Sequence, residues 1–223
     1  MTERHLIGTQ TARSQQYFNK VSLFFSDLLL YGVISKYAWG ASIARLDAHY
    51  ARYATANHLD VGVGTGFLLN RVNFSRPPRL ALMDLSEHCL AKTQQKLRRY
   101  APSLHVQNVL EPVTHALAAF DSIGFNSVMH CVPGAFDQKG IAFQHLAALL
   151  APHGVLFGTT VLGAGVRKNL LARPFMWLMN ALGVFNNRQD SAHDLQAFLR
   201  AHFTVVEFEV AGVTAFFAVE AKT

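Results

Sequence analysis

The sequence is poor in cysteine and in metal-binding patterns. Its 223 residues include two cysteines, Cys89 and Cys131, which stand far apart and form no C-x-x-C pair. This spacing excludes a disulfide framework and a cysteine-based metal or redox centre. The 11 histidines show no H-E-x-x-H spacing, so we predict no metal site. A chain with so little cysteine fits a reducing, cytoplasmic location.

Long hydrophobic runs are also missing. The most apolar stretches, residues 28–34 and 175–179, are each much shorter than the ~18 residues that indicate a membrane span. The first residues, Met-Thr-Glu-Arg-His, lead into no apolar core with a small-residue cleavage site, so we expect no secretory signal. The sequence therefore predicts neither a membrane span nor export.

Charged residues make up only 15% of the chain, whereas hydrophobic residues make up 51%. Such a chain must expose apolar surface, which indicates an apolar ligand pocket, a homodimer contact or both. The net charge of +6 is spread along the chain, with one basic cluster at residues 92–99. That cluster falls on an expected helix and most simply forms its solvated face. We therefore predict no nucleic-acid partner.

What the chain does contain is a glycine-rich run between an expected strand and an expected helix. Residues 60–66 read Asp-Val-Gly-Val-Gly-Thr-Gly, the strand precedes them at 57–61, and the helix follows at 67–72. Alternate glycines in this context let the backbone approach a nucleoside ligand closely. The same glycines also occur where a strand and a helix merely pack closely, so this alternative stays open.

The spacing separates the possible cofactors. A dinucleotide fingerprint needs glycine at its sixth place, where this chain has Phe67. No Gly-Lys-Ser or Gly-Lys-Thr follows, so the residues that hold a nucleoside triphosphate and its magnesium are missing. A second expected strand, 79–84, ends in Asp84, whose carboxylate can accept hydrogen bonds from both hydroxyls of a ribose. An aspartate in this place is often only a helix cap.

Together these residues resemble the class I S-adenosylmethionine-dependent methyltransferases of small molecules, from about Asp60 to the C-terminus. The resemblance implies an α/β, doubly wound fold whose mostly parallel seven-stranded sheet closes with an antiparallel strand pair, here 203–210 and 213–220. It implies S-adenosyl-L-methionine as cofactor and S-adenosyl-L-homocysteine as product.

The expected domain organisation has two parts. Residues 1–55 would form an N-terminal helical cap, and residues 56–223 would form the methyltransferase domain with a lid-like insertion at 163–188.

The resemblance also implies which residues bind the cofactor. They lie in the glycine loop and after the second, third and fourth strands, and they are Asp60, Gly62, Gly64, Gly66, Asp84, Leu85, Asn108, Val109, Leu110 and Asn126. Asn108 stands where the family usually has an acidic residue near the adenine amino group, and an amide can form hydrogen bonds there too. The two prolines typical of enzymes that methylate base amino groups are missing after Asn126, which favours a small-molecule acceptor.

Aromatic and methionine side chains are candidates for the acceptor site. Ligands of open α/β sheets bind beyond the carboxyl ends of the strands, where the insertion and the N-terminal helices would meet. An alternative is that these side chains pack only on the core or on a second subunit. The candidate substrate residues are Tyr37, Trp39, Met129, Phe175, Met176 and Met179.

His130 is the candidate general base, because it follows the fourth expected strand and imidazole titrates near neutral pH. A supporting or core histidine is the competing interpretation. We expect methyl transfer to a small apolar or aromatic metabolite, at oxygen rather than at nitrogen or carbon. A fold of this kind can also bind the cofactor while it catalyses a non-methylating, pericyclic reaction or binds a partner, so that alternative stays open.

Overall fold

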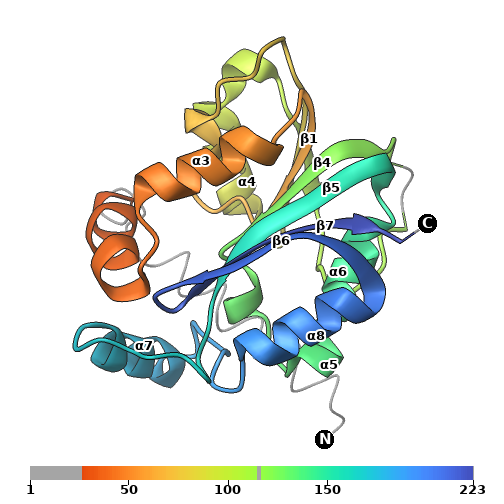
Figure 1. The fold of residues 1–223 in the computed structure, drawn as a ribbon. Coiled ribbons are helices and arrows are strands. Elements are labelled where there is room, and N and C mark those ends of the chain that lie inside the picture. The colour runs from red at the N-terminus through yellow and green to blue at the C-terminus, as the bar shows by residue number, and fades with distance from the viewer. Residues whose placement is uncertain (1–26, 115–116, 223) are drawn as a thin grey trace, which may run out of the picture.

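The computed structural model describes residues 27–114 and 117–222 (Figure 1). Their helices begin with η1 (Leu28–Trp39), which has the wide winding of a π-helix, and α3 (Ile43–Tyr53). Ser42 caps α3 by accepting a hydrogen bond from the backbone N–H of Arg45. These helices agree with a helical segment before the sheet. Residues 1–26 of the expected cap lie outside the described residues, and the division at residue 55 stays a prediction.

Seven strands form one sheet in the order β3-β2-β1-β4-β5-β7-β6. β1 to β5 are parallel, and β7 runs antiparallel between β5 and β6. The strands are β1 (Asn57–Val61), β2 (Arg79–Asp84), β3 (Ser103–Val106), β4 (Phe120–Asn126), β5 (Leu150–Val161), β6 (Phe203–Ala211) and β7 (Thr214–Ala221). The predicted doubly wound sheet with its antiparallel closing pair is confirmed. The strand order reverses between β1 and β4, and ligands of such sheets bind at this crevice.

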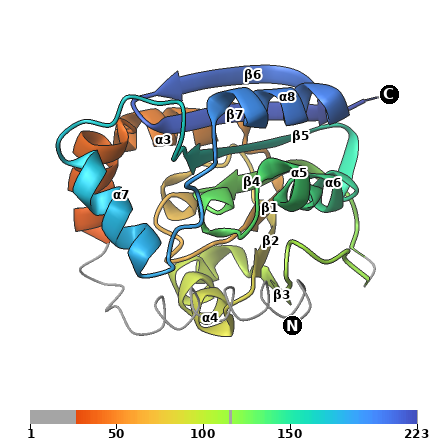
Figure 2. The same cartoon turned by 90° about the horizontal axis from the view of Figure 1, so that it is seen from below.

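Helices cover both faces of the sheet, as Figures 1 and 2 show. The helices after β1 are η2 (Leu69–Arg71), α4 (Glu87–Lys96), η3 (Arg98–Tyr100), η4 (Met129–Cys131), α5 (Phe136–Lys139), α6 (Ile141–Ala147), α7 (Ala172–Ala181) and α8 (Ala192–His202). One hydrophobic cluster joins the sheet to α3 and α4, and another joins it to α5, α6 and α8. β4 and β7 are therefore buried along most of their length, as expected for strands covered on both sides.

The segment after the glycine loop differs from the expectation. The structure has only the short 3-10 turn η2, where the sequence favoured an amphipathic helix over 67–72. Leu68 and Leu69 are anchored in the core, and Pro77 and Pro78 follow soon after. Because proline lacks a backbone N–H and restricts the residue before it, a helix has little room to extend here.

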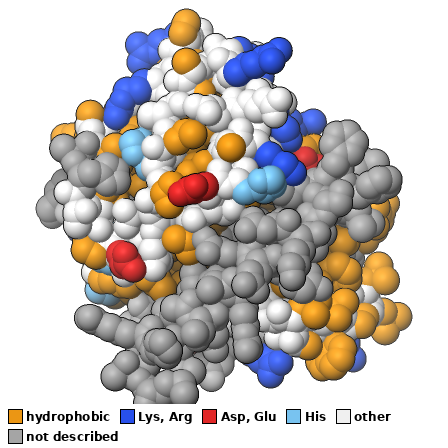
Figure 3. All heavy atoms as spheres, turned by 180° about the vertical axis from the view of Figure 1, so that it is seen from behind, with side chains coloured by type: hydrophobic (Ala, Val, Ile, Leu, Met, Phe, Trp, Pro, Cys, Tyr) orange, Lys and Arg blue, Asp and Glu red, His pale blue; other side chains and the backbone are white. Residues whose placement is uncertain are grey.

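The insertion leaves the sheet after β5 and returns next to its own start. The backbone N–H groups of Gly163 and Ala164 both donate to Asp190 O, at 3.0 and 2.9 Å. Asn187 Nδ2 donates to Val161 O at 2.8 Å. The insertion carries α7, which lies beside η1, and hydrophobic side chains gather at the surface in this region (Figure 3). No helix in the described ranges is long and apolar enough to cross a membrane.

Candidate active site

The glycine loop after β1 has a backbone that only glycine adopts easily. Gly62, Gly64 and Gly66 have φ angles of 68°, 51° and 67°, in the left-handed region. A Cβ on Gly62 would lie 2.1 Å from Val128 Cγ2, whereas a Cβ on Gly64 would meet no atom within 4 Å. The loop is therefore tightly packed where it leaves β1 and open at its middle, where a ligand can approach the backbone.

Asp84 lies beside that open middle. Its Oδ2 accepts a hydrogen bond from Gly64 N at 3.3 Å, and its Oδ1 accepts one from Ser86 N at 2.8 Å. Burial raises the pKa of Asp84, and these backbone N–H groups act in the opposite direction. The end of β2 thus presents a carboxylate next to the glycine loop, the arrangement that a ribose diol requires. Leu85, also assigned to the cofactor, follows it and is half-buried.

Asp60 lies at the end of β1, is buried, and contacts the side chains of Tyr50 and His58. Tyr50 from α3 donates its hydroxyl to Asp60 Oδ1 at 2.9 Å. His58 Nε2 lies 3.6 Å from the same oxygen and is Asp60's ion-pair partner among the described residues. Ser122 from β4 contacts His58 Nδ1 at 2.8 Å. Within residues 27–114 and 117–222 no lysine or arginine pairs with Asp60, and a buried carboxylate in such a place favours a cationic ligand, such as the ammonium and sulfonium of the predicted cofactor.

Close approach between strands explains a further glycine. A Cβ at Gly124 on β4 would lie 2.6 Å from Asp60 Oδ1 and 3.3 Å from the ring of His58. Any larger residue at position 124 would collide with the buried carboxylate of Asp60. Asn126, two residues later, is buried, and its Oδ1 accepts a hydrogen bond from Thr159 Oγ1 at 3.3 Å. The ends of β1 and β4 therefore place Asp60 and Asn126 at the predicted crevice.

The loop after β3 holds Asn108 through its own side chain. Asn108 Oδ1 accepts from Leu110 N at 3.1 Å, and Nδ2 donates to Glu111 Oε1 at 3.1 Å. Val109 and Leu110 are partly buried against the core. The amide thus shapes a turn in the apolar loop after β3. Contact of Asn108, Val109 and Leu110 with an adenine stays a prediction.

Helix η1 and its N-cap residue Asp27 contact the glycine loop, and no motif in the sequence predicts these contacts. Thr65 donates its hydroxyl to Asp27 Oδ1 at 2.6 Å. The Tyr31 ring stacks on Phe67 with 4.7 Å between ring centroids. Tyr31, Tyr50 and Asp27 were missed because no motif marks the pairs that they form with Phe67, Asp60 and Thr65. They tie the helices before β1 to the cofactor loop.

His130 is unsuited to the role of general base in this structure. Its Nδ1 accepts a hydrogen bond from Val161 N at 3.2 Å, so the lone pair that would take a proton is occupied. Burial, with a smaller contribution from Lys139, lowers the pKa of His130 to about 3. The ring packs edge-on against Phe185, with centroids 4.4 Å apart. These contacts favour the competing interpretation, a supporting histidine, over the role of general base.

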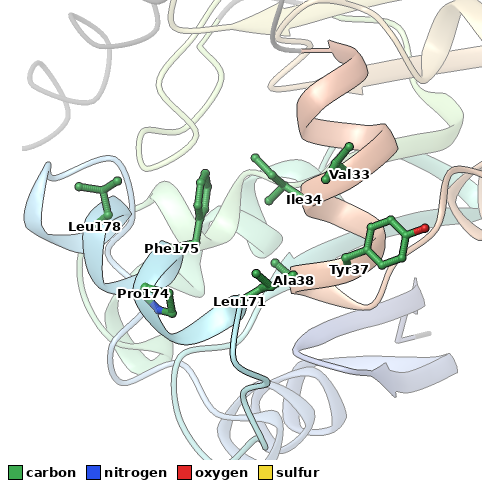
Figure 4. Close-up of a pocket in the computed structure, with 8 residues that line it drawn as sticks. All are labelled: Val33, Ile34, Tyr37, Ala38, Leu171, Pro174, Phe175 and Leu178. Atoms are coloured by element: carbon green, nitrogen blue, oxygen red, sulfur yellow. The ribbon is translucent and has the colours of Figure 1, made fainter.

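An apolar groove of about 270 Å³ separates η1 from α7 (Figure 4). Two of the predicted substrate residues, Tyr37 and Phe175, lie on its two sides. The lining residues are Val33, Ile34, Tyr37, Ala38, Leu171, Pro174, Phe175 and Leu178. Asn169 Nδ2 donates to Tyr37 O at 2.7 Å and so joins the insertion to η1. The insertion and the N-terminal helices therefore meet at an apolar site, as expected for a lid.

The other predicted substrate residues lie behind this groove. Trp39 is buried and packs against Phe175 at 5.8 Å between ring centroids. Met176 and Met179 belong to the same hydrophobic cluster. Met129 is completely buried in a core cluster, which favours the alternative that it is a packing residue, and its assignment to the substrate stays a prediction. Tyr37 and Phe175 are the predicted substrate residues that line the groove, and their contact with an acceptor stays a prediction.

The chain is similar to known methyltransferases over most of its length. A family model described as a methyltransferase domain matches residues 59–156. The chain is 39% identical over 203 residues to demethylluteothin O-methyltransferase of Streptomyces thioluteus, and the alignment covers 91% of this chain and 88% of that protein. It is 34% identical over 221 residues to methyltransferase aurB of Calcarisporium arbuscula, with 93% and 96% covered.

A solved structure shows the same fold. The N-methyltransferase NodS of Bradyrhizobium japonicum, in complex with S-adenosyl-L-homocysteine, superposes with a TM-score of 0.64 at 16% identity. The superposition covers 95% of this chain and 100% of NodS. With the glycine loop and the sheet order, these similarities show that the chain belongs to the class I S-adenosylmethionine-dependent methyltransferases.

Proposed function

We propose that the enzyme methylates a hydroxyl group of a small apolar or aromatic molecule held between η1 and α7. The observation that carries the proposal is the groove lined by Tyr37 and Phe175, whose other lining side chains are all apolar. Apolar pockets with few polar groups are the usual form of small-molecule sites. The similar protein from Streptomyces thioluteus is named as an O-methyltransferase, which supports oxygen as the methylated atom.

The residues of the glycine loop, with Asp60 and Asp84, are proposed to hold the cofactor. Bound S-adenosyl-L-methionine supplies a methyl group that is already activated on its sulfonium. The protein's own contribution is to exclude water and to align the acceptor. η1 and α7 are suited to exclude water, because Trp39 packs against Phe175, which lines the groove, and against Phe185.

The state of His130 narrows the class of acceptor. Since its Nδ1 is engaged by Val161 N–H and its pKa is about 3, this histidine does not take a proton near neutral pH. An acceptor that loses its proton to water without much help is therefore favoured. Phenols ionise with a pKa of about 10, far below that of water at about 16. We infer a phenolic or enolic hydroxyl, rather than an aliphatic alcohol, as the methylated group.

Methyl transfer can be tested with the full chain, methyl-labelled cofactor and a panel of phenols, enols, aliphatic alcohols and amines. We expect labelled product from phenols or enols, with the methyl group on oxygen as located by NMR. Label transferred only to amines or to carbon would overturn the proposal. Cofactor binding by calorimetry without transfer to any acceptor would instead favour the non-methylating alternative.

Phe175→Ala tests where the acceptor binds. Loss of an aromatic contact should raise the KM for the acceptor by about tenfold, while the Kd of the cofactor stays within about twofold by calorimetry. Val206→Ala, at an exposed apolar position on β6, is the matched control and should change neither value. An unchanged KM in Phe175→Ala would exclude the groove as the acceptor site.

A further inference from the structure

Large hydrophobic side chains lie exposed around the groove. Leu170 and Trp177 are 87% and 69% exposed, although aromatic and branched side chains of this size usually avoid water. With their exposed neighbours they form one surface, here named the α7 patch: Val33, Tyr37, Leu170, Leu171, Trp177 and Leu178. Figure 3 shows hydrophobic side chains concentrated in this region.

The charges of the α7 patch have one sign. No aspartate or glutamate occurs between residues 162 and 189, whereas that segment contains Arg167, Lys168, Arg173 and Arg188. η1 adds Lys36, which lies 4.9 Å from the centroid of the Tyr37 ring. The nearest acidic residue to this segment along the chain, Asp190, is buried and paired with Lys139. The acidic residue directly before η1, Asp27, is paired with Lys96 and accepts a hydrogen bond from Thr65. The patch thus combines exposed apolar side chains with positive charge.

Three hydrogen bonds of the Asn169 side chain hold the patch in shape. Its Oδ1 accepts from Leu171 N at 3.0 Å and from Ala172 N at 2.8 Å, which caps the start of α7. Its Nδ2 bonds to Tyr37 O. The exposed leucines at 170 and 171 therefore stand at a fixed turn beside η1, so the surface needs little ordering to bind a partner.

We propose that the α7 patch docks on the surface of an anionic lipid bilayer. Helices with tryptophan and leucine beside lysine and arginine lie in the bilayer interface, where apolar side chains enter the acyl region and cations meet lipid phosphates. A second copy of the chain is a poorer occupant. A twofold contact would set the patch against itself and bring Arg167 and Arg173 near the same cations of the partner.

The groove opens within the patch, since Val33, Tyr37, Leu171 and Leu178 both line the groove and lie exposed. Docking would therefore place the mouth of the groove against the bilayer, and an apolar acceptor dissolved in lipid would enter without crossing water. This second step rests on the proposed function. Bilayer docking itself does not.

Vesicle binding tests the docking. The full chain is mixed with phosphatidylcholine vesicles containing phosphatidylglycerol, or with pure phosphatidylcholine vesicles, and bound protein is separated by flotation. We expect binding to the anionic vesicles that weakens with salt. The two tryptophans are Trp39 and Trp177, so in Trp39→Phe the fluorescence of Trp177 alone should shift to the blue on binding.

Paired variants locate the contact. Leu170→Ser with Trp177→Ser should reduce partitioning by at least about tenfold, because both apolar anchors are lost. Arg167→Glu with Arg173→Glu should remove the preference for anionic lipid, at roughly fivefold or more per residue. Leu104→Ser with Val106→Ser removes exposed apolar side chains from β3, the edge strand at the other end of the sheet from β6. This control should leave binding to the vesicles unchanged.

Several results would overturn docking. Docking is wrong if the protein does not bind anionic vesicles at low salt, or if the β3 control loses as much vesicle binding as the Leu170 and Trp177 variant. It is also wrong if light scattering shows a dimer that becomes a monomer in the Leu170 and Trp177 variant. Thermal melts and methyl transfer without vesicles show whether each variant is folded. Trp177→Phe should retain binding. Methyl transfer that persists while vesicle binding fails would remove this inference and leave the proposed function intact.

Discussion

The hydroxyl of Tyr50 on α3 donates a 2.9 Å hydrogen bond to Oδ1 of Asp60, the carboxylate that begins the glycine loop. Both side chains are buried. The proximity of Asp60, after burial itself, raises the pKa of Tyr50 well above its ordinary value, so the phenol stays a donor. Helix α3 thus stabilises the one charge at the end of β1 that would otherwise be poorly compensated.

Removing this hydrogen-bond donor should lower the stability of the fold more than removing a donor whose acceptor is partly exposed. Tyr50→Phe should lower the free energy of unfolding by about 1.5–3 kcal/mol, the range for hydrogen bonds to charged groups. Tyr53→Phe is the control, because Tyr53 donates at 2.6 Å to Glu207, which is 21% exposed. Its loss should be below about 1 kcal/mol. Equal losses in urea unfolding would contradict the role given to Asp60.

Asp84→Asn should weaken cofactor binding. Replacing one carboxylate oxygen by an amide removes a charged acceptor, and we expect a Kd roughly ten to a hundred times higher by calorimetry. Because burial raises the pKa of Asp84, the affinity of the native protein should fall as the pH drops through that pKa, and the variant's should not. Asp137→Asn, on the exposed side of α5, should leave the Kd unchanged.

The buried pair of Lys139 and Asp190 gives a pH-dependent prediction. Lys139 Nζ lies 2.7 Å from Asp190 Oδ2, and both side chains are fully buried. Burial raises the pKa of Asp190 to about 6, and Lys139 acts to lower it. Lys139→Met should therefore raise this pKa further and destabilise the fold by about 3–5 kcal/mol near pH 8.

The sign follows from proton binding. A carboxyl group whose pKa is higher in the folded chain than in the unfolded chain binds its proton more tightly when folded. The stability that Asp190 contributes in Lys139→Met should therefore be fully present below the unfolded pKa of about 3.9 and should be lost as the pH rises through the folded pKa toward 8. Adding Asp190→Leu should restore much of the stability and flatten this dependence. A flat profile in the single variant would show that Asp190 is not buried as described.

The pH profile of methyl transfer tests His130. Since its pKa is about 3 and its Nδ1 is engaged, kcat/KM should show no limb near pH 6.5 that belongs to this residue. His130→Gln should keep the shape of the profile, with kcat lowered by less than about tenfold. A loss of a hundredfold or more, together with disappearance of a limb near pH 6.5, would restore His130 as the base.

The sheet and the glycine loop could be predicted because their signals are local. Strand, turn and helix residues follow one another in the sequence, and the β2 range matches the expected 79–84. The sequence predicted that the insertion and the N-terminal helices would meet, but it did not predict the contact that joins them, since Asn169 bonds to Tyr37 across 132 positions. The same holds for His130, whose basic nitrogen is occupied by a backbone N–H from β5. Residue type and position in a motif do not reveal which partner a side chain meets.

The two ends of the insertion meet where Gly163 and Ala164 bond to Asp190. Because the ends of the insertion bond to each other, a change in its length or composition should affect the sheet little. Closing a longer loop costs little additional entropy. The segment that forms one wall of the groove can thus be exchanged as a cassette. If the proposed acceptor site is right, changes in this segment alter the choice of acceptor while the glycine loop and the sheet stay the same.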